Sequence, residues 1–484
     1  MGTGNLNLVR KIIGITSLVE SIALLGCIPI ALIYNESISP FLISALISGL
    51  IAFILLVLRG GKATLIPDKI DVRQGVLSVT LSWLTLSLIG SLPYIFSHSV
   101  EGFIDPVFES ISGFTTTGSS ILTDIEALPY SVLFWRSLTH WIGGIGIIVL
   151  VIIIMPGMNI GSHRLFILES SLRDKTHPKT KSVGLRLLYI YVGLTLVLTL
   201  LLLLGNMNLF ESVCHAFGTI ATGGFSPKNT SIAGYSPYIQ YVIMLFMLAS
   251  GINFVLYYYL LKGDVKRIRR NEELKLYLFI IVVSGLLVTF QLIINGGVSA
   301  ELAFRDSFFQ VVSIISSTGF ATTDYLLWPS AGIMVIFLLM FSGGCMGSTS
   351  GGIKVGRHLF QLKTLKDNFK MMLHPNAVTS VKINGNTISQ QHKQMVLGFI
   401  LLYFFVFVIG AVLMTLLGSD IKTSAGAVAT TMGGIGPGLG MVGPVSNFAS
   451  LPDLSKLLLS GLMLLGRLEI YTILLLFTRG IWKV

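Results

Sequence analysis

Four short stretches rich in threonine, serine and glycine interrupt an otherwise apolar sequence, and their backbone is suited to binding a cation. They read Ser-Gly-Phe-Thr-Thr-Thr-Gly at 112–118, Thr-Ile-Ala-Thr-Gly-Gly-Phe at 219–225, Ser-Ser-Thr-Gly-Phe at 316–320 and Met-Gly-Gly-Ile-Gly-Pro at 432–437. Non-helical backbone is tolerated at membrane depth only where protein or a water-filled cavity satisfies its amide and carbonyl groups. Extended Thr-Gly backbone meets this condition in a pore, because its carbonyl oxygens can replace the water around a cation. We therefore predict that these stretches, filter loops one to four, line an ion pore.

The predicted cation ligands are backbone carbonyls of three consecutive residues in each loop. Glycine ends each triplet, since the chain there must enter conformations closed to residues with a Cβ. The four glycines follow one another at intervals of 105, 96 and 117 residues, which is typical of an internal repeat. Small-residue contacts between membrane helices explain one copy, but not four copies that each follow a half-length helix. The predicted ligands are Thr116, Thr117, Gly118, Ala221, Thr222, Gly223, Ser317, Thr318, Gly319, Gly434, Ile435 and Gly436.

The composition indicates the class of protein in which these loops lie. The chain has 484 residues, of which 53% are hydrophobic and 11% charged, whereas soluble proteins average about 25% charged residues. A membrane-spanning helix needs roughly 20 mostly apolar residues, and such runs recur from Ile12 to Phe477. We predict an all-α polytopic membrane protein.

Each filter loop lies between apolar segments, so we predict four pseudo-repeated helix–pore loop–helix units around a central pore. An N-terminal two-helix hairpin precedes them, with helices at 12–34 and 40–58. The predicted divisions are 1–75 for the hairpin and a cytoplasmic linker, then 76–183, 184–273, 274–393 and 394–484 for the four units.

Each unit should also contain a pore helix of about 12 residues, which at 1.5 Å per residue reaches only halfway through a bilayer. These helices are expected at 102–114, 209–220, 300–316 and 420–431. The partial negative charge at the end of each helix would favour a cation. Asp105, Asp306 and Asp420 stand near the helix starts, where they could cap the helices or contact ions.

The basic residues indicate the orientation. The chain has a net charge of +11, and its Lys and Arg residues gather in 59–73, 164–186, 262–275 and 354–393. Residues 97–130 contain no Lys or Arg. This pattern predicts cytoplasmic basic loops, cytoplasmic termini and outward-facing pore loops rather than nucleic-acid binding. The basic segments could also contact anionic lipid. The acidic residues of the first outer connection could concentrate cations or simply be solvated: they are Glu101, Asp105, Glu109, Asp124 and Glu126.

A second unusual stretch, residues 342–354, interrupts an expected long helix from 329 to 365. It is not a phosphate-binding loop, because Ile353 separates Gly352 from Lys354 and no buried strand precedes it. Glycine absorbs the dihedral changes of a moving element, so we predict a gate, with a passive helix break as the alternative. The predicted gate residues are Gly343, Gly344, Gly347, Ser348, Thr349, Gly351 and Gly352.

Arg467 completes the predicted gate. It lies within the expected final helix, 454–477, and an intramembrane charge normally faces the protein interior or a water-filled cavity. It could form a positive barrier below the filter, or pair with Glu469 and only fasten helices together.

On these motifs the chain resembles the Trk/Ktr/HKT superfamily of cation transporters, and within it the TrkH family. Further matches are Gly-Gly-Cys-Met-Gly-Ser-Thr-Ser-Gly-Gly-Ile-Lys-Val at 343–355, His-Pro-Asn-Ala-Val at 374–378, Gly-Pro-Gly-Leu-Gly at 436–440 and Gly-Arg-Leu-Glu at 466–469. The N-terminal hairpin is also TrkH-like. One departure is Gly433-Gly434, where relatives often carry Asn-Asn.

The resemblance implies potassium uptake across the bacterial cytoplasmic membrane, with K⁺ as the transported ion and no organic cofactor in this chain. It also implies a homodimer and a TrkA-type cytoplasmic subunit that binds nucleotide and gates the pore. Glycine in all four loops is typical of potassium-selective members. A sodium- or proton-coupled symporter of the same superfamily is the alternative.

Functions of other classes fit the sequence less well. The eight histidines show no His-Glu-x-x-His spacing and no obvious nucleophile partner, so we expect no enzyme. A scaffold or receptor would not need four filter loops.

Overall fold

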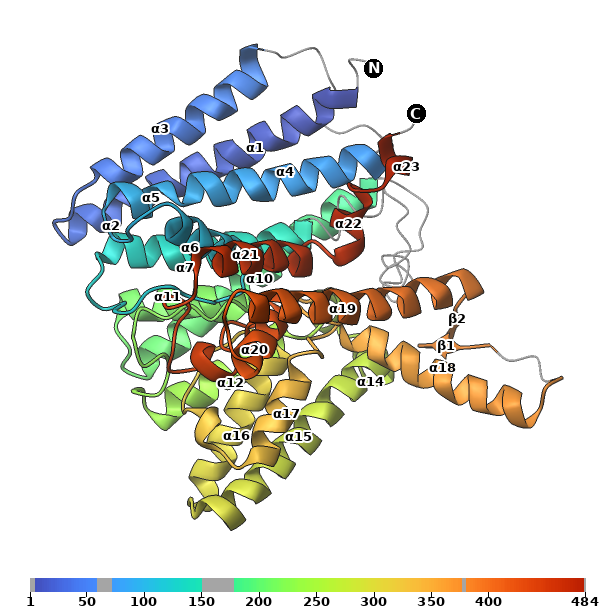
Figure 1. Ribbon diagram of the computed structural model, residues 1–484. Coiled ribbons are helices and arrows are strands. Elements are labelled where there is room, and N and C mark those ends of the chain that lie inside the picture. Colours follow the sequence, from blue (N-terminus) through green and yellow to red (C-terminus); the bar gives the residue numbers. More distant parts are fainter. Residues whose placement is uncertain (1–4, 59–71, 150–177, 377–379, 483–484) are drawn as a thin grey trace.

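The computed structural model describes residues 5–58, 72–149, 178–376 and 380–482. These residues are mostly helical (Figure 1), and six of their helices are long and apolar enough to cross a membrane, or seven if one bent pair is counted as a span. The predicted all-α polytopic membrane class is confirmed. Most of the expected basic segment 59–73 and the first part of the expected basic segment 164–186 lie outside the described residues.

The N-terminal hairpin packs against the first helix of unit one. It comprises α1 (Asn5–Leu25), α2 (Ile28–Ile33), α3 (Ser39–Phe53) and a π-helical turn, η1 (Ile54–Leu58). Its connecting loop is fastened to helix α7 (Tyr130–Val149): Glu36 accepts hydrogen bonds from the amides of Tyr130 and Ser131 at 2.6 and 2.9 Å. These amides belong to the first turn of α7, where no helical carbonyl can satisfy them. Glu36 thus fixes the hairpin to the pore-forming part of the chain.

The remaining elements repeat one order: a long helix, a short pore helix, a filter loop and a second apolar helix. The first unit has α4 (Val72–Gly90), α5 (Leu92–Phe96), α6 (Ile104–Phe114) and α7. The second has α10 (Pro178–Leu204), α11 (Leu209–Ile220), α12 (Pro237–Ser250), α13 (Phe254–Leu261) and α14 (Val265–Arg270). The third has α15 (Glu272–Gly296), α16 (Ala300–Ile315), η3 (Tyr325–Leu327), α17 (Ser330–Leu339), α18 (Val355–Leu373) and the strands β1 (Lys382–Ile383) and β2 (Asn386–Thr387). The fourth has α19 (Gln390–Leu416), α20 (Ile421–Gly433), η4 (Gly440–Val442), α21 (Asp453–Arg467), α22 (Ile470–Leu475) and α23 (Arg479–Trp482). The divisions drawn from the sequence remain a prediction.

The pore helices α6, α11, α16 and α20 begin and end within two residues of the expected positions. Asp420 caps α20, since its carboxylate accepts a hydrogen bond from Thr423 N at 3.1 Å. Asp105 lies in the first turn of α6 and pairs with a lysine, whereas Asp306 lies further inside α16 and accepts a hydrogen bond from Thr322 Oγ1. Capping therefore explains only Asp420.

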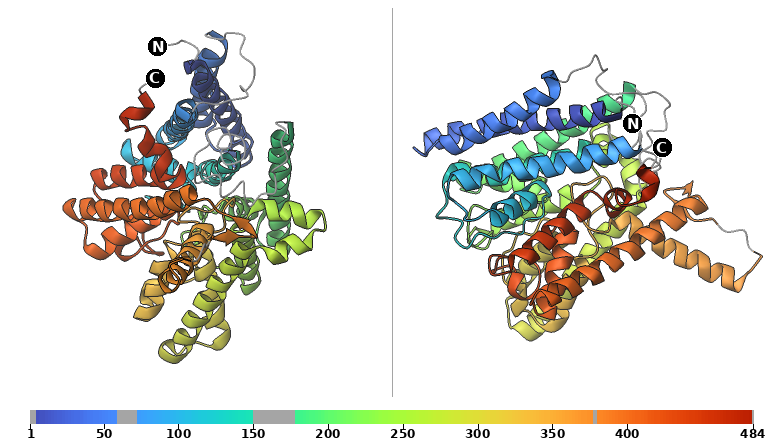
Figure 2. Two further views of the ribbon diagram at one scale, coloured as in Figure 1. Left: turned by 90° about the vertical axis from the view of Figure 1, so that its right-hand side faces the viewer. Right: turned by 45° about the horizontal axis from the view of Figure 1, so that its top comes forward.

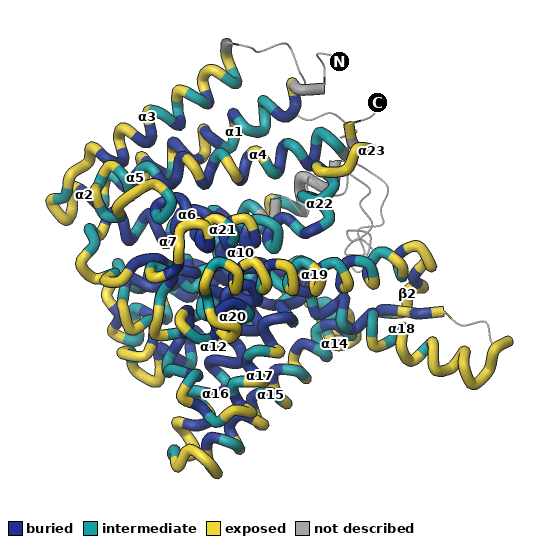
Figure 3. The backbone as a smooth tube through the Cα atoms, viewed as in Figure 1, coloured by how far each residue is buried: buried dark blue, intermediate teal, exposed yellow. Residues whose placement is uncertain are grey.

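Buried residues concentrate where the pore helices and filter loops meet (Figure 3). The ends of the described chain, α1 and α23, lie toward the same end of the molecule as the α18 and β1–β2 extension (Figures 1 and 2). Arg73 at the start of α4 lies over the Trp482 ring, 4.8 Å from its centroid. This arrangement agrees with termini on one side of a membrane.

The second apolar helix is broken in units two, three and four. The axes of α12 and α13 differ by 97°, residues 340–354 separate α17 from α18, and α21 ends before α22 begins. The expected unbroken helix 454–477 is therefore wrong. The chain turns at Glu469, whose φ is +63°, and the polar contacts of Arg467 and Glu469 with other units take the place of helical continuity.

Candidate ion pore

All four pore helices end with the same backbone geometry. One residue at the end of each helix is left-handed, with φ of 53° at Thr116, 54° at Thr222, 55° at Ser317 and 64° at Gly434; it is the C-cap of α20 and follows the C-cap of the other three helices. The amide of the following residue donates to the carbonyl five residues earlier, at 2.8–3.0 Å; these pairs are Thr117 to Ser112, Gly223 to Gly218, Thr318 to Ser313 and Ile435 to Thr430. This is the Schellman pattern of a helix C-terminus. The helix ends thus set the exit direction of every filter loop.

The glycine that completes each loop also has a positive φ: 79° at Gly118, 82° at Gly224, 84° at Gly319 and 100° at Gly436. In loop two the counterpart of Gly118 is therefore Gly224, one residue later than the predicted Gly223. Gly223 corresponds to Thr117, Thr222 to Thr116, and Ala221 to Thr115. The sequence offers two adjacent glycines here, and the prediction took the first of them; the positive φ values at Thr222 and Gly224 show that the second completes the loop.

Contacts between successive loops form a closed ring. A Cβ added to Gly118 would lie within 3.0 Å of Gly223 O, one added to Gly224 within 3.0 Å of Thr318 O, and one added to Gly319 within 3.0 Å of Ile435 O. A Cβ on Gly436 would lie 3.1 Å from Thr117 O, which closes the circuit. The structure thus brings the four predicted triplets together, with each completing glycine against a carbonyl of the next loop in the chain.

Hydroxyl pairs support two of the four loops. Thr115 and Thr117 are joined through their hydroxyls at 2.8 Å in loop one, as are Ser316 and Thr318 in loop three. The corresponding residues are Ala221 and Gly223 in loop two and Gly433 and Ile435 in loop four, which have no hydroxyl. Loops one and three, on opposite sides of the ring, therefore share a restraint that the other two cannot have.

A buried ion pair behind loop one was not predicted as part of the site. Arg136 Nε lies 2.7 Å from Glu109 Oε1, and both side chains are almost fully buried. Glu109 also accepts hydrogen bonds from Ile121 N and Ser120 Oγ, both at 3.0 Å. The pair therefore holds the segment that leaves loop one.

Arg136 also reaches loop two. Its Nη1 donates to Ser226 O at 2.9 Å, and its guanidinium lies 3.7 Å from the centroid of the Phe225 ring. His140 stacks on the same ring at 4.0 Å, and its Nδ1 lies 2.8 Å from Gly113 O. These residues join the first two quadrants.

The spacing of buried polar residues in the pore helices could have indicated these supporting contacts from the sequence. Glu109, His215 and Gln310 each precede the completing glycine of their loop by nine residues and are buried polar residues in apolar pore helices. A buried polar side chain at the same position of a repeat indicates a supporting role.

The acidic outer connection does not present a bare negative surface. Asp105 pairs with Lys456 at 2.6 Å, Glu109 with Arg136, and Glu126 with Lys228 at 3.2 Å. The hydrogen bond to Glu126 raises the pKa of Lys228, so that this lysine keeps its charge. The sequence pattern missed these partners because Lys228 and Lys456 belong to other units. Three of the five acidic residues are thus paired with basic residues, and concentration of cations by this connection stays a prediction.

The predicted gate residues other than Arg467 lie in one segment, residues 342–354, which we call the inner loop. It contacts three filter quadrants: Thr349 Oγ1 donates to Ile220 O at 3.1 Å, and Gly351 N donates to Ser317 Oγ at 2.6 Å. A Cβ on Gly351 would lie within 3.0 Å of Gly433 O. The inner loop thus packs directly against the ends of the pore helices.

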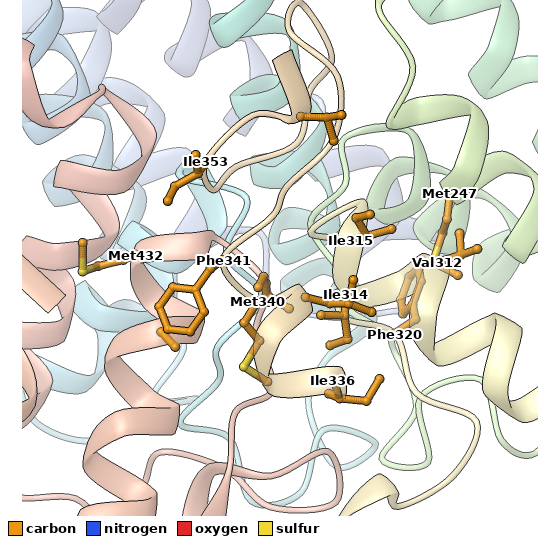
Figure 4. Packing of buried hydrophobic residues seen from close by; sticks show 14 of the residues in the cluster. Met247, Val312, Ile314, Ile315, Phe320, Ile336, Met340, Phe341, Ile353 and Met432 are labelled. Carbon is orange, nitrogen blue, oxygen red and sulfur yellow. The ribbon is translucent and has the colours of Figure 1, made fainter. Parts of the chain in front are cut away.

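The inner loop is held at both of its ends. Glu273, near the start of α15, accepts hydrogen bonds from Met346 N at 2.7 Å and Gly356 N at 2.8 Å. At the bend between α12 and α13, Cys345 N donates to Gly251 O and Phe254 N donates to Gly347 O. The surrounding apolar side chains pack closely (Figure 4); they include Ile314, Ile336, Met340, Phe341, Ile353 and Met432.

Arg467 joins the inner loop to two further units. Its Nη1 donates to Thr349 O at 2.7 Å and its Nη2 to Gly143 O of α7 at 3.1 Å. Glu469 accepts a hydrogen bond from Arg357 Nη2 at 2.8 Å. The contact of Arg467 with the inner loop agrees with the predicted gate, and it leaves both the barrier and the fastening roles open.

Two substitutions of Arg467 separate these roles. Arg467→Gln removes the charge but keeps a hydrogen-bond donor, whereas Arg467→Lys keeps the charge without the two-pronged contact. If the charge is a barrier, the Gln variant is expected to conduct about tenfold faster, which corresponds to about 1.4 kcal/mol, and the Lys variant to conduct like the wild type. Rubidium flux into liposomes measures this. Equal acceleration in both variants would assign Arg467 a fastening role only.

The donors available to an ion are backbone carbonyls and hydroxyls. Within the described residues no group of three or more His, Cys, Asp or Glu side chains could hold a metal ion.

Comparisons with known proteins agree with this geometry. The family described as "TrkH: Cation transport protein" matches residues 45–482. Over 423 residues the chain is 37% identical to the "Trk system potassium uptake protein TrkI" of Halomonas elongata, covering 86% of each protein. It is 32% identical to the "Trk system potassium uptake protein TrkG" of Escherichia coli, covering all of both. The crystal structure of the potassium transporter TrkH from Vibrio parahaemolyticus matches with a TM-score of 0.89 at 32% identity, over 99% of each chain.

Proposed function

Because the chain belongs to the TrkH family of cation transport proteins, we propose that it takes up potassium through the ring of four filter loops. The observation that carries this proposal is the circuit of glycine-to-carbonyl contacts from Gly118 back to Gly436. The family consists of membrane cation transporters rather than enzymes. The names of similar proteins include the words "potassium uptake", which supports potassium as the transported ion.

The proposed ligands are carbonyl groups of the predicted triplets, with loop two moved by one residue to Thr222, Gly223 and Gly224. A ring of carbonyl dipoles can replace the hydration shell of a potassium ion without binding it too tightly to leave. The four pore helices end beside this ring, and the partial negative charge at each C-terminus adds to the cation preference. We expect the hydroxyl pairs and the Glu109–Arg136 ion pair to keep the diameter of the carbonyl ring constant.

The inner loop is the proposed gate. It lies against three quadrants of the ring and continues directly into α18, which extends away from the bundle toward the β1–β2 extension (Figure 1). The turn of this extension contacts α15: Asn384 N donates to Glu272 Oε2 at 2.8 Å, and Glu272 N to Asn384 Oδ1 at 2.9 Å. A partner that moves α18 could therefore act on the loop and on its Glu273 anchor together.

We further propose that the chain works as a homodimer with a TrkA-type cytoplasmic subunit that binds nucleotide. The phrase "Trk system" in the names of similar proteins supports a multicomponent assembly. The chain is assigned to the bacterial inner membrane as a multi-pass protein. The positive-inside pattern supports cytoplasmic termini and outward filter loops.

Flux into liposomes tests the function. The purified protein is expected to admit rubidium at least about tenfold faster than sodium, a difference of about 1.4 kcal/mol. A second arm imposes a proton or sodium gradient: uptake driven uphill by either gradient would identify the symporter alternative, whereas passive equilibration identifies a channel. Protein-free liposomes are the control. Equal rubidium and sodium uptake by the wild type would contradict the proposed potassium filter.

A further inference from the structure

A carboxylic acid side chain is buried where the N-terminal hairpin meets the first pore helix. Glu20 of α1 is completely buried, and neither of its oxygens has a hydrogen-bond partner among the described residues. An ionised carboxylate in an apolar environment is so unfavourable that the group normally becomes neutral.

Because Gly90 of α4 has no side chain, polar atoms of two other helices lie close together beside it. A Cβ on Gly90 would lie 3.3 Å from Glu20 Oε1 and 2.8 Å from Ser110 Oγ of pore helix α6. Ser110 is buried, as are Ser17, one turn before Glu20, and Ser87, one turn before Gly90. The hydroxyls of these three serines have no hydrogen-bond partner in the part of the chain that the structure describes. Three helices thus contribute to one buried polar cluster.

Ser48 of α3 indicates which form of Glu20 fits this cluster. It lies beside Glu20, and its hydroxyl proton already goes to Ser17 O at 2.8 Å. Ser48 Oγ can therefore only accept a further hydrogen bond. A carboxylate has no proton to donate, whereas a carboxylic acid has one.

The charged groups around the cluster do not neutralise a carboxylate. Among the described residues α3 and η1 carry none, and Arg73 of α4 lies 17 residues from Gly90, about 25 Å along the helix. Arg10 and Lys11 of α1 are separated from Glu20 by about 14 Å or more of helix. The carboxylates on α6 are paired elsewhere, Asp105 with Lys456 and Glu109 with Arg136.

We propose that Glu20 is a proton-binding site within the membrane, occupied at neutral pH, which joins the N-terminal hairpin to pore helix α6. The protonated acid has a proton to donate to a serine hydroxyl, and Ser48 of α3 and Ser110 of α6 are the candidate acceptors. Phe114, the last residue of α6, also lies beside Gly90. Loss of the proton would leave a negative charge beside the helix that leads into filter loop one.

Infrared spectroscopy tests the site without any transport measurement. The wild type in lipid at neutral pH is expected to show a carboxylic acid C=O band that shifts on hydrogen–deuterium exchange. Glu20→Gln, which imitates the protonated acid, should remove one carboxyl group per chain from this band. The control Glu101→Gln changes an exposed carboxylate and should leave the band intact. A band that is unchanged in Glu20→Gln would overturn the proposal.

Rubidium flux tests the link to the pore. Wild-type flux is expected to fall as the pH rises through the range in which the infrared band disappears, while Glu20→Gln keeps its neutral-pH flux. Equal decline in both proteins would overturn the link to α6. If neither protein transports, the potassium function fails while the infrared result still decides the proton site.

Discussion

Replacing Gly118 by serine is expected to remove most of the preference for rubidium over sodium. Gly118 has a φ of +79°, and a Cβ there would lie within 3.0 Å of Gly223 O in the next loop. A left-handed residue with a Cβ costs on the order of 1–2 kcal/mol, and the collision adds to this cost. Because the atom displaced is a proposed ion ligand, we expect the selectivity ratio in proteoliposomes to fall at least about tenfold.

Gly102 offers a matched control for this variant. Its φ of +74° is similar, but no atom of the described residues lies within 4 Å of an added Cβ. Gly102→Ser therefore imposes comparable backbone strain without touching a carbonyl and should keep its selectivity. A Gly118→Ser protein that assembles normally and retains the wild-type ratio would refute the carbonyl ring as the source of selectivity.

Deleting Met346 to Ser350 is expected to raise flux in the absence of a regulatory partner. The deletion removes Thr349, which contacts Ile220 O and Arg467, and Ser350, which accepts a hydrogen bond from Gly344 N. If the closed state is favoured by about 1.4 kcal/mol, roughly a tenth of the wild-type pores are open, so flux can rise by up to about tenfold. Rubidium uptake with and without the partner measures this.

Thr349→Val is the milder companion of the deletion. It keeps the length and shape of the inner loop but removes the hydroxyl that donates to Ile220 O. It should raise basal flux less than the deletion while responding to the partner. Low basal flux with full partner dependence in the deletion protein would show that the inner loop is only a helix break.

The pore helices could be predicted from sequence because their signal is local. Each is a short apolar run followed by a glycine-rich loop, and the ends of α11 at Leu209 and Ile220 agree with the expected range. The membrane-protein class follows from composition in the same way. These features depend on neighbours along the chain, which the sequence displays directly.

The parts that could not be predicted depend on partners from distant units. The register of loop two was predicted one residue too early, because only the backbone φ values at Thr222 and Gly224 distinguish the two adjacent glycines. The break after Arg467 depends on carbonyls of Thr349 and Gly143, which are more than 100 residues away. Asp105 pairs with Lys456 of the fourth unit, 351 residues later in the sequence. Local patterns contain no record of such contacts.

The hydroxyl pairs make the four sides of the filter-loop ring unequal, because only loops one and three have them. Thr115–Thr117 and Ser316–Thr318 brace two opposite quadrants, while Ala221, Gly223, Gly433 and Ile435 offer no such brace. A tetramer of identical subunits has to dilate equally along both diagonals on average, but a single chain is free of that constraint. Thermal fluctuations of the ring should therefore be anisotropic. The distance between loops two and four should fluctuate more than the distance between loops one and three.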